Sequence, residues 1–141
     1  MDNNDIRWLQ RFSNFEKAFL RFKECLQVED PNELERNGIV QRFEFTLEAG
    51  WKTLKDYLQA EGLDFPLTPK GTLRQAQQSG LITYAQDLID ALEIRNELAH
   101  DYDGDKFEKS EILIREKIYP VLTEHYSFFR NQINKNQLNL L

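Results

Sequence analysis

Apolar residues recur at steps of three and four along most of the chain, and this spacing predicts α-helices. A first helix is expected from about Asp5 to Val28, and a second from Asn32 or Ile39 to Ala60. No segment alternates between apolar and polar residues as a half-buried strand does, so no β-strand is expected. The apolar positions expected to face the core in these two helices are Leu9, Phe12, Phe15, Phe19, Phe22 and Leu26, then Ile39, Phe43, Leu47, Trp51, Leu54 and Leu58.

Two further features concern the ends and the interior of helices. Thr68 and Pro69 have the residue types of an N-cap and a first helical residue, and Gly80 is expected to end the short third helix that they begin. Gly50 lies inside the second helix, where glycine costs about 1 kcal/mol relative to alanine. A close helix crossing would justify this glycine, and a merely tolerated position explains it equally well.

The second half of the chain predicts two longer helices. The fourth should run from Leu81 to about Tyr102 and end at Gly104, and the fifth should start near Lys106. Pro120 falls within the apolar pattern of the fifth and should kink or split it. The polar end, residues 131–141, is expected to fray. The predicted fold is therefore all-α, an antiparallel bundle of four to five helices.

Composition places the chain among intracellular globular proteins. Residues 1–141 fit one domain, and Cys25 is the only cysteine, which favours a reducing compartment and hence the cytoplasm. No apolar run approaches the roughly 20 residues that span a bilayer, so no membrane contact is expected. The net charge of −6 disfavours broad charge-driven binding of nucleic acid and leaves room for a local phosphate site. Cys25 and His125 are both expected to be structural.

The most informative residues lie on the fourth helix. Arg95 falls on its apolar stripe, where an arginine is costly unless it is paired or part of a functional site. Asn96 lies one turn before His100, and Tyr102 lies two turns after Arg95. An arginine fork fits phosphate oxygens, a histidine moves protons at neutral pH, and an asparagine orients a hydroxyl. The set suits phosphoryl chemistry, and no metal is required.

A plainer interpretation uses the same residues. Arg95 would pair with Glu93 or Asp101, and His100 would cap the helix end. On residue types alone, this interpretation is the preferred one. Glu44 and Glu48, four residues apart on the second helix, are further candidates: they could hold Arg95 or Arg42, or bind a cation, with an ordinary salt bridge the commoner outcome.

Two segments resemble a known superfamily. Residues 95–102, Arg-Asn-Glu-Leu-Ala-His-Asp-Tyr, resemble the HEPN motif of Arg, four residues, His, one residue and Tyr. Residues 42–58 resemble the sequence typical of one branch, the nucleotidyltransferase substrate-binding proteins, and residues 80–82 also fit. The resemblance covers about residues 7–129.

The resemblance implies a HEPN-like bundle that forms a complex with a minimal nucleotidyltransferase encoded beside it. Related HEPN proteins are toxins that cut RNA and are neutralised by their partner transferases. Arg95 and His100 would then be the ribonuclease pair, Asn96 the polar helper, and Tyr102 the residue that the partner modifies with AMP. The chain departs from the pattern at residues 98–99, Leu-Ala, where relatives often carry Thr-Ser.

Three functions remain open from the sequence. The first is a HEPN-type toxin, a metal-independent endoribonuclease without a cofactor, paired with and neutralised by a minimal nucleotidyltransferase antitoxin. The second is a non-catalytic subunit that binds a substrate or nucleotide for a two-subunit nucleotidyltransferase. The third is a structural dimerisation module. A homodimer is expected in any case, because aromatic stripes and an inward Arg95 exceed what one small bundle covers.

Overall fold

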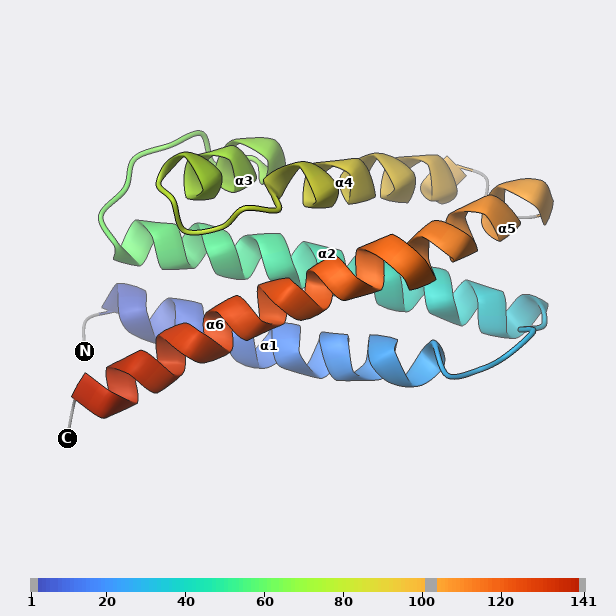
Figure 1. Ribbon diagram of the computed structural model, residues 1–141, viewed down its shortest axis with the longest axis horizontal. Helices are drawn as coiled ribbons and strands as arrows, with labels where there is room; N and C mark the ends of the chain where they lie inside the picture. The colour runs from blue at the N-terminus through green and yellow to red at the C-terminus, as the bar shows by residue number, and fades with distance from the viewer. Residues whose placement is uncertain (1–2, 101–103, 140–141) are drawn as a thin grey trace.

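Six α-helices and one π-helical turn form the regular structure of residues 3–100 and 104–139, which the computed structural model describes. Within those residues no strand occurs, so the all-α prediction is confirmed. The last three elements follow one another without a break and form a single rod. The described residues therefore form five rods (Figure 1). The elements are α1 (Asn3–Cys25), α2 (Glu33–Ala60), α3 (Pro69–Gln78), α4 (Ala85–His100), α5 (Gly104–Leu113), η1 (Ile114–Ile118) and α6 (Tyr119–Asn139).

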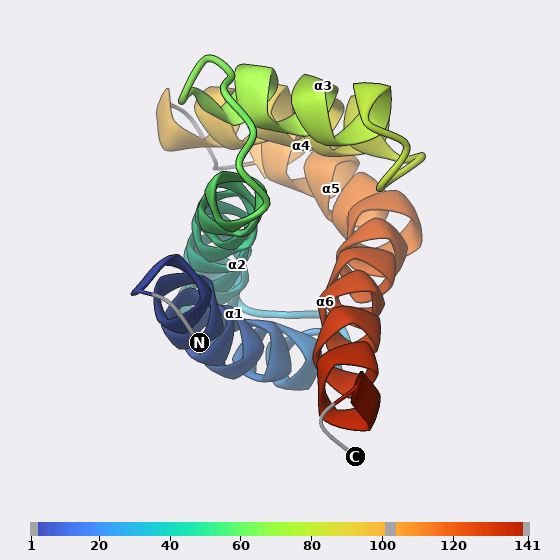
Figure 2. The ribbon, with the colours of Figure 1, turned by 90° about the vertical axis from the view of Figure 1, so that its left-hand side faces the viewer.

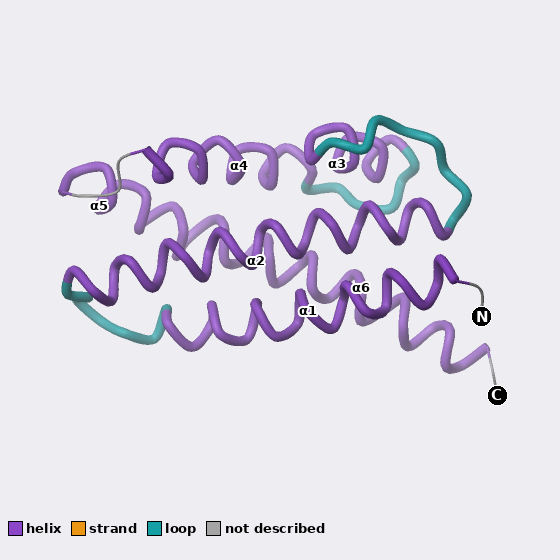
Figure 3. Tube along the Cα trace, turned by 180° about the vertical axis from the view of Figure 1, so that it is seen from behind, coloured by secondary structure: helices purple, strands orange, loops and turns teal. Residues whose placement is uncertain are grey.

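The rods enclose one shared core. Figure 2 shows the α1–α2 pair facing the rod of α5 and α6, with α3 and α4 lying across one side. The start of α1 and the end of α6 lie at the same end of the bundle (Figure 1). A loop over residues 61–68 carries the chain from α2 to α3 (Figure 3). Among the described residues, no helix is both long and apolar enough to cross a membrane.

Aromatic side chains of α1 dominate this core. The predicted phenylalanines are all buried, and Trp8, which the spacing of the stripe did not include, is buried too. The Trp8 ring meets the Tyr57 ring of α2 edge to face, with 5.0 Å between their centroids. Such pairs contribute about 0.5–1.5 kcal/mol beyond the apolar area that they bury. The spacing of phenylalanines along α1 therefore predicted the correct buried face.

The helix ends follow local chemistry. α2 begins at the earlier of the two predicted positions, because Asn32 and Glu35 form a capping box with both hydrogen bonds at 2.9 Å. Thr68 caps α3 by accepting a hydrogen bond from the Gly71 N–H at 3.0 Å, as predicted. Gly80 follows α3 with φ of +77°, a conformation that favours glycine.

The fourth helix starts later than the sequence predicted. It begins at Ala85 instead of Leu81, and the Ala85 N–H donates to Gln77 Oε1 of α3 at 3.0 Å. The Leu81 N–H still bonds back to the end of α3, and Tyr84 turns its hydroxyl into the core. Tertiary bonds thus occupy residues 81–84 that local periodicity had assigned to the helix. Gly104 begins α5, so its predicted role as the terminator of the fourth helix is wrong.

Pro120 interrupts the regular α-helical hydrogen bonding of the last rod. Pro120, at the second position of α6, has no N–H to donate, and its ring clashes with the preceding turn of a regular helix. The residues before it form the π-helical turn η1, in which the Tyr119 N–H bonds to the Ile114 carbonyl five residues back. The predicted disruption is confirmed, and the rod continues through it.

The last rod continues into the polar C-terminal stretch. Residues 131–139, expected to fray, belong to α6. Ile133 packs against the core, and the Tyr57 hydroxyl of α2 donates to Gln132 Oε1 at 3.2 Å. These contacts supply the tertiary packing that a polar helix end lacks by itself.

At the centre of the core, α2 and α6 approach closely at Gly50. A Cβ on Gly50 would lie 3.2 Å from the Phe15 ring and 3.3 Å from the His125 ring, so the close-crossing explanation of this glycine holds. His125 is fully buried, and its Nε2 lies 3.0 Å from the Gly50 carbonyl oxygen. Because a carbonyl only accepts, Nε2 carries the proton and Nδ1 accepts from the Tyr84 hydroxyl at 2.8 Å. His125 is structural, as predicted.

This buried imidazole makes stability depend on pH. Burial lowers the pKa of His125 to about 4 from 6.5, although the bond to Gly50 opposes the shift. The unfolded chain therefore takes up this proton first as the pH falls. We expect the His125 contribution to the free energy of unfolding to decline by about 3 kcal/mol between pH 6.5 and pH 4, and to be flat above and below. Urea unfolding at half-unit pH steps measures the decline.

His125→Gln is the matched control for this prediction. Its amide can donate to the Gly50 carbonyl but does not titrate, so the carboxylates contribute equally to both curves. The difference between the two proteins isolates the histidine. Parallel curves from pH 7 to pH 4 would contradict the assigned neutral, buried imidazole.

Candidate functional site

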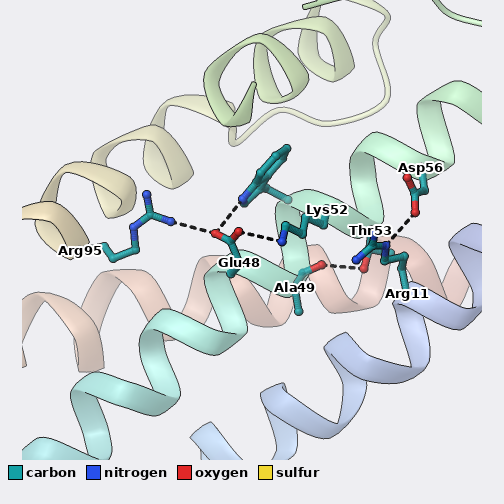
Figure 4. A network of polar contacts seen from close by, with 8 residues as sticks. Arg11, Glu48, Ala49, Lys52, Thr53, Asp56 and Arg95 are labelled. Atoms are coloured by element: carbon teal, nitrogen blue, oxygen red, sulfur yellow. Dashed lines mark hydrogen bonds and ion pairs between the residues drawn. The ribbon is translucent and has the colours of Figure 1, made fainter. Parts of the chain in front are cut away.

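The candidate site centres on an ion pair between α4 and α2. Arg95 Nη1 of α4 lies 3.1 Å from Glu48 Oε2 of α2 (Figure 4). The Arg95 side chain is 24% exposed, so its guanidinium reaches the edge of the packed interface and stays in contact with water. One predicted alternative, that Glu48 holds Arg95, is confirmed. Of the other predicted partners, Asp101 lies outside the described residues.

Glu48 gathers two more donors from its own helix. The Trp51 Nε1–H donates to Glu48 Oε2 at 3.1 Å, and Lys52 Nζ lies 3.1 Å from Oε1. Partial burial by itself raises the pKa of Glu48, but the hydrogen bonds from Trp51 and Lys52 and the charges of Lys52 and Arg95 outweigh it and lower the pKa below its ordinary value. Glu48 is therefore a carboxylate at neutral pH, held in one orientation by three partners.

The polar helper predicted next to Arg95 is placed beside it. Asn96 is exposed, and its Oδ1 accepts a hydrogen bond of 3.4 Å from Arg95 Nη2. One guanidinium nitrogen thus faces Glu48 and the other faces Asn96. An arginine fork of this kind suits phosphate oxygens.

The other two predicted residues lie at the limit of the description. His100 is the last residue of α4, and its side chain lies outside the described part. Tyr102 falls in residues 101–103, which also lie outside it. In α4 the backbones of Arg95 and His100 are five residues apart, which corresponds to about 7.5 Å along the helix axis and about 140° around it.

A second ion pair on the same side of α2 was not predicted. Asp56 is only 2% exposed, and its Oδ2 accepts a hydrogen bond of 3.0 Å from Arg11 Nε of α1. A carboxylate buried between Leu54 and Tyr57 was the signal that could have revealed it, since such a group needs a cation. Figure 4 shows Arg95, Glu48, Lys52 and Arg11 in succession across α2.

Other chemical candidates do not form sites. Among the side chains that the structure describes, no group of three or more His, Cys, Asp or Glu could hold a metal ion. Glu44 lines a separate shallow hollow on α2 beside Gln41. Burial raises the pKa of the Cys25 thiol to about 11, despite the opposing charges of Arg42 and Arg115, so this half-buried thiol is unreactive at neutral pH.

Comparison with known proteins gives one family and two related structures. The family described as "Nucleotidyltransferase substrate binding protein like" matches residues 10–131. A crystal structure of a protein from Thermus thermophilus is 34% identical, covers 79% of this chain and 94% of its own, and has a TM-score of 0.69. No curated protein matches the chain.

The second structure is a tri-AMPylated HEPN toxin of Shewanella oneidensis, determined in complex with an MNT antitoxin. It is 12% identical, covers 93% of this chain and 99% of its own, and has a TM-score of 0.74. At that identity the likeness shows the fold. The chain therefore belongs to the nucleotidyltransferase substrate-binding protein-like family, and its all-α bundle has the HEPN fold.

Proposed function

We propose that the chain is a HEPN-type toxin, an endoribonuclease that needs no metal ion, paired with and neutralised by a minimal nucleotidyltransferase. The observation that carries this proposal is the fixed guanidinium of Arg95, which Glu48 holds at the edge of the bundle. Arg95 precedes His100 by the spacing of the HEPN motif, and the fold is that of a HEPN toxin. The arrangement supplies a phosphate-binding fork and a proton carrier on one helix.

The reaction would be an intramolecular displacement at phosphorus. The ribose 2′-oxygen attacks the adjacent phosphorus, and the bond from phosphorus to the 5′-oxygen breaks. The 2′-hydroxyl loses its proton and the departing 5′-oxygen gains one, which leaves a 2′,3′-cyclic phosphate and a 5′-hydroxyl. His100 would act as the general base or general acid, and Arg95 would stabilise the charge that develops on the phosphoryl oxygens.

The proposed partner follows from the family and the related complex. The family is described by substrate binding for a nucleotidyltransferase, and the tri-AMPylated Shewanella oneidensis HEPN toxin was determined with an MNT antitoxin. By analogy, the partner of this chain would transfer AMP to Tyr102, seven residues after Arg95. A phosphodiester there would occupy the arginine or repel the RNA backbone.

The family description also favours a second function. In that case the chain would be a non-catalytic subunit that holds a nucleotide or another substrate for the transferase. Arg95 and Asn96 would bind the phosphates in both functions. Cleavage of RNA by the isolated chain distinguishes the two functions, because only the first predicts it.

We expect the chain to be a homodimer. Arg95 and His100 lie about 140° apart around α4, so one helix does not direct both at the same phosphate. A two-fold axis beside α4 would bring the Arg95 of one protomer near the His100 of the other. Light scattering after size-exclusion chromatography should give about twice 16.8 kDa at micromolar concentration. A mass of one chain throughout that range would exclude the shared site.

Cleavage of RNA should persist in EDTA and depend on two residues. A positioned general acid or base contributes roughly 10²–10⁴-fold to a rate, so His100→Ala should lower cleavage of a single-stranded RNA by that factor. Arg95→Ala should lower it similarly, because it removes the charge that faces the phosphoryl oxygens. Gel analysis of labelled RNA gives the rates and identifies the 2′,3′-cyclic end.

Arg74→Ala is the control for this experiment. It removes an exposed arginine of α3, and its cleavage rate should match that of the unmodified chain. Circular dichroism establishes that each variant is folded. Cleavage that requires a divalent ion, or that survives His100→Ala, contradicts the mechanism, and absence of cleavage favours the substrate-binding function.

Modification of Tyr102 can be measured independently of cleavage. Co-expression with the neighbouring nucleotidyltransferase should add AMP to the chain, and Tyr102→Phe should abolish the adduct. The adduct should also suppress RNA cleavage, because a bulky anion would block the arginine. Intact-mass and peptide mass spectrometry locate the group. An active, bound transferase that leaves Tyr102 unmodified would contradict the proposed control.

A further inference from the structure

Two shallow hollows lie over the seam between α1 and α2 on the surface of the bundle. One hollow of about 210 Å³ is lined by Arg11, Phe45 and Lys52, among others, and a second is lined by Arg21 and Arg42. The two helices are tied beneath the groove, where Thr46 Oγ1 donates to the Ala18 carbonyl at 3.1 Å. We call the surface over these two hollows the α1–α2 groove.

The charge of this groove is opposite to that of the chain. Its two hollows are lined by four cationic side chains and by two acidic ones, Glu24 and Glu48, whereas the whole chain has a net charge of −6. Within the described residues, neither Arg21 nor Arg42 forms an ion pair with an acidic side chain. Arg21 and Arg42 therefore give the groove a local excess of positive charge, which favours an anionic ligand.

An aromatic ring lies among these cations. Phe45 is 53% exposed, and it sits on α2 between Arg42, one turn before it, and Lys52, two turns after it. An exposed ring with cations on both sides is the arrangement that binds single-stranded nucleic acid, because bases stack on the ring while phosphates meet the cations. An acidic protein segment would use the cations and leave the ring unused.

The groove also leads to the candidate site. Lys52 in the groove and Arg95 on α4 bind the two oxygens of the same carboxylate, Glu48 (Figure 4). A strand lying over Phe45 and Lys52 therefore has Arg95 as its next cationic contact. From Arg11 to Arg21 the groove extends about 15 Å along α1, which accommodates about four nucleotides at the ~3.4 Å spacing of a stacked strand.

We propose that the α1–α2 groove binds a single-stranded segment of RNA, with a base stacked on Phe45 and phosphates bound by Arg21, Arg42 and Lys52. The choice of RNA as the ligand rests on the proposed ribonuclease function, whereas the groove and its chemistry do not. The groove would hold the strand beside the bond that Arg95 and His100 cleave.

Binding can be measured without cleavage. A fluorescent 12-nucleotide RNA with 2′-O-methyl groups has no free 2′-hydroxyl to attack phosphorus, so its anisotropy reports binding by the full chain alone. Phe45→Ala should weaken binding at least fivefold, since one stacked base contributes about 1–3 kcal/mol. The double variant Arg21→Gln and Lys52→Gln should reduce the slope of log affinity against log salt by about 1.4, which is ~0.7 for each phosphate that the variant no longer neutralises.

Matched controls separate the groove from general changes of surface. Leu67→Ala removes an apolar side chain of nearly equal exposure, 54%, and Lys70→Gln with Arg74→Gln removes two cations of α3. Both should bind as the unmodified chain does. Arg11 is left intact in all variants, because its loss would leave the buried Asp56 without its partner.

The outcomes distinguish this inference from the proposed ribonuclease. Groove-dependent binding by a chain that cleaves no RNA supports the groove and rejects the nuclease. Normal cleavage and binding by Phe45→Ala and by the double variant overturn the groove and leave the nuclease standing. Polyglutamate that displaces the labelled RNA equally well from the unmodified chain and from Phe45→Ala also overturns the inference. That result would mean that the cations bind acidic protein and that the ring plays no part.

Discussion

The close approach of α1, α2 and α6 at Gly50 sets the geometry on which the rest of the bundle depends. A Cβ at position 50 would lie 3.2 Å from the Phe15 ring and 3.3 Å from the His125 ring, so at this position α2 meets the core with its backbone. Its rotation about its own axis is then fixed. Glu48 and Lys52 lie two residues before and after Gly50, about 200° around the helix, and are thereby directed to the outer surface. A buried contact thus decides which side chains line the candidate site.

On that outer surface, Glu48 links the helices that carry the proposed chemistry. An exposed ion pair contributes at most about 1 kcal/mol, so Glu48 adds little to stability. Its value lies in geometry, because Trp51 and Lys52 restrain the carboxylate, and the carboxylate in turn restrains Arg95. An arginine fixed before its ligand arrives loses less side-chain entropy on binding than a freely rotating one.

Local patterns in the sequence predicted the fold, and tertiary contacts explain the differences. The spacing of phenylalanines in α1 and the caps at Asn32 and Thr68 act within one or two turns, so they are legible in the sequence. The start of α4 depends on Gln77 and on the burial of Tyr84, which periodicity does not reveal. Likewise, proline chemistry predicted a disruption at Pro120, but not that a π-helical turn would absorb it.

The candidate site likewise contains residues that the sequence could predict and residues that it could not. Arg95, Asn96 and the Glu48 alternative came from residue types and spacing on single helices. The pair of Arg11 and Asp56 joins residues 45 positions apart, so no local spacing could reveal it. The α1–α2 groove was equally hidden, because its cations alternate between two helices and its positive charge disappears in the total for the chain.

The negative net charge of the chain and the local positive charge of the groove act together on an approaching strand. At physiological ionic strength, charges farther apart than about 8 Å are largely screened, so a strand in the groove would experience Arg21 and Arg42, which form no ion pair within the described residues, more than distant carboxylates. A strand approaching from farther away meets a molecule of net charge −6 and gains little attraction. In the proposed function, such a surface would suit a short exposed segment that reaches the groove better than a long duplex, which would also contact the acidic surface around it. In the proposed function, the negative net charge would therefore restrict RNA binding to the groove beside Arg95 instead of excluding it.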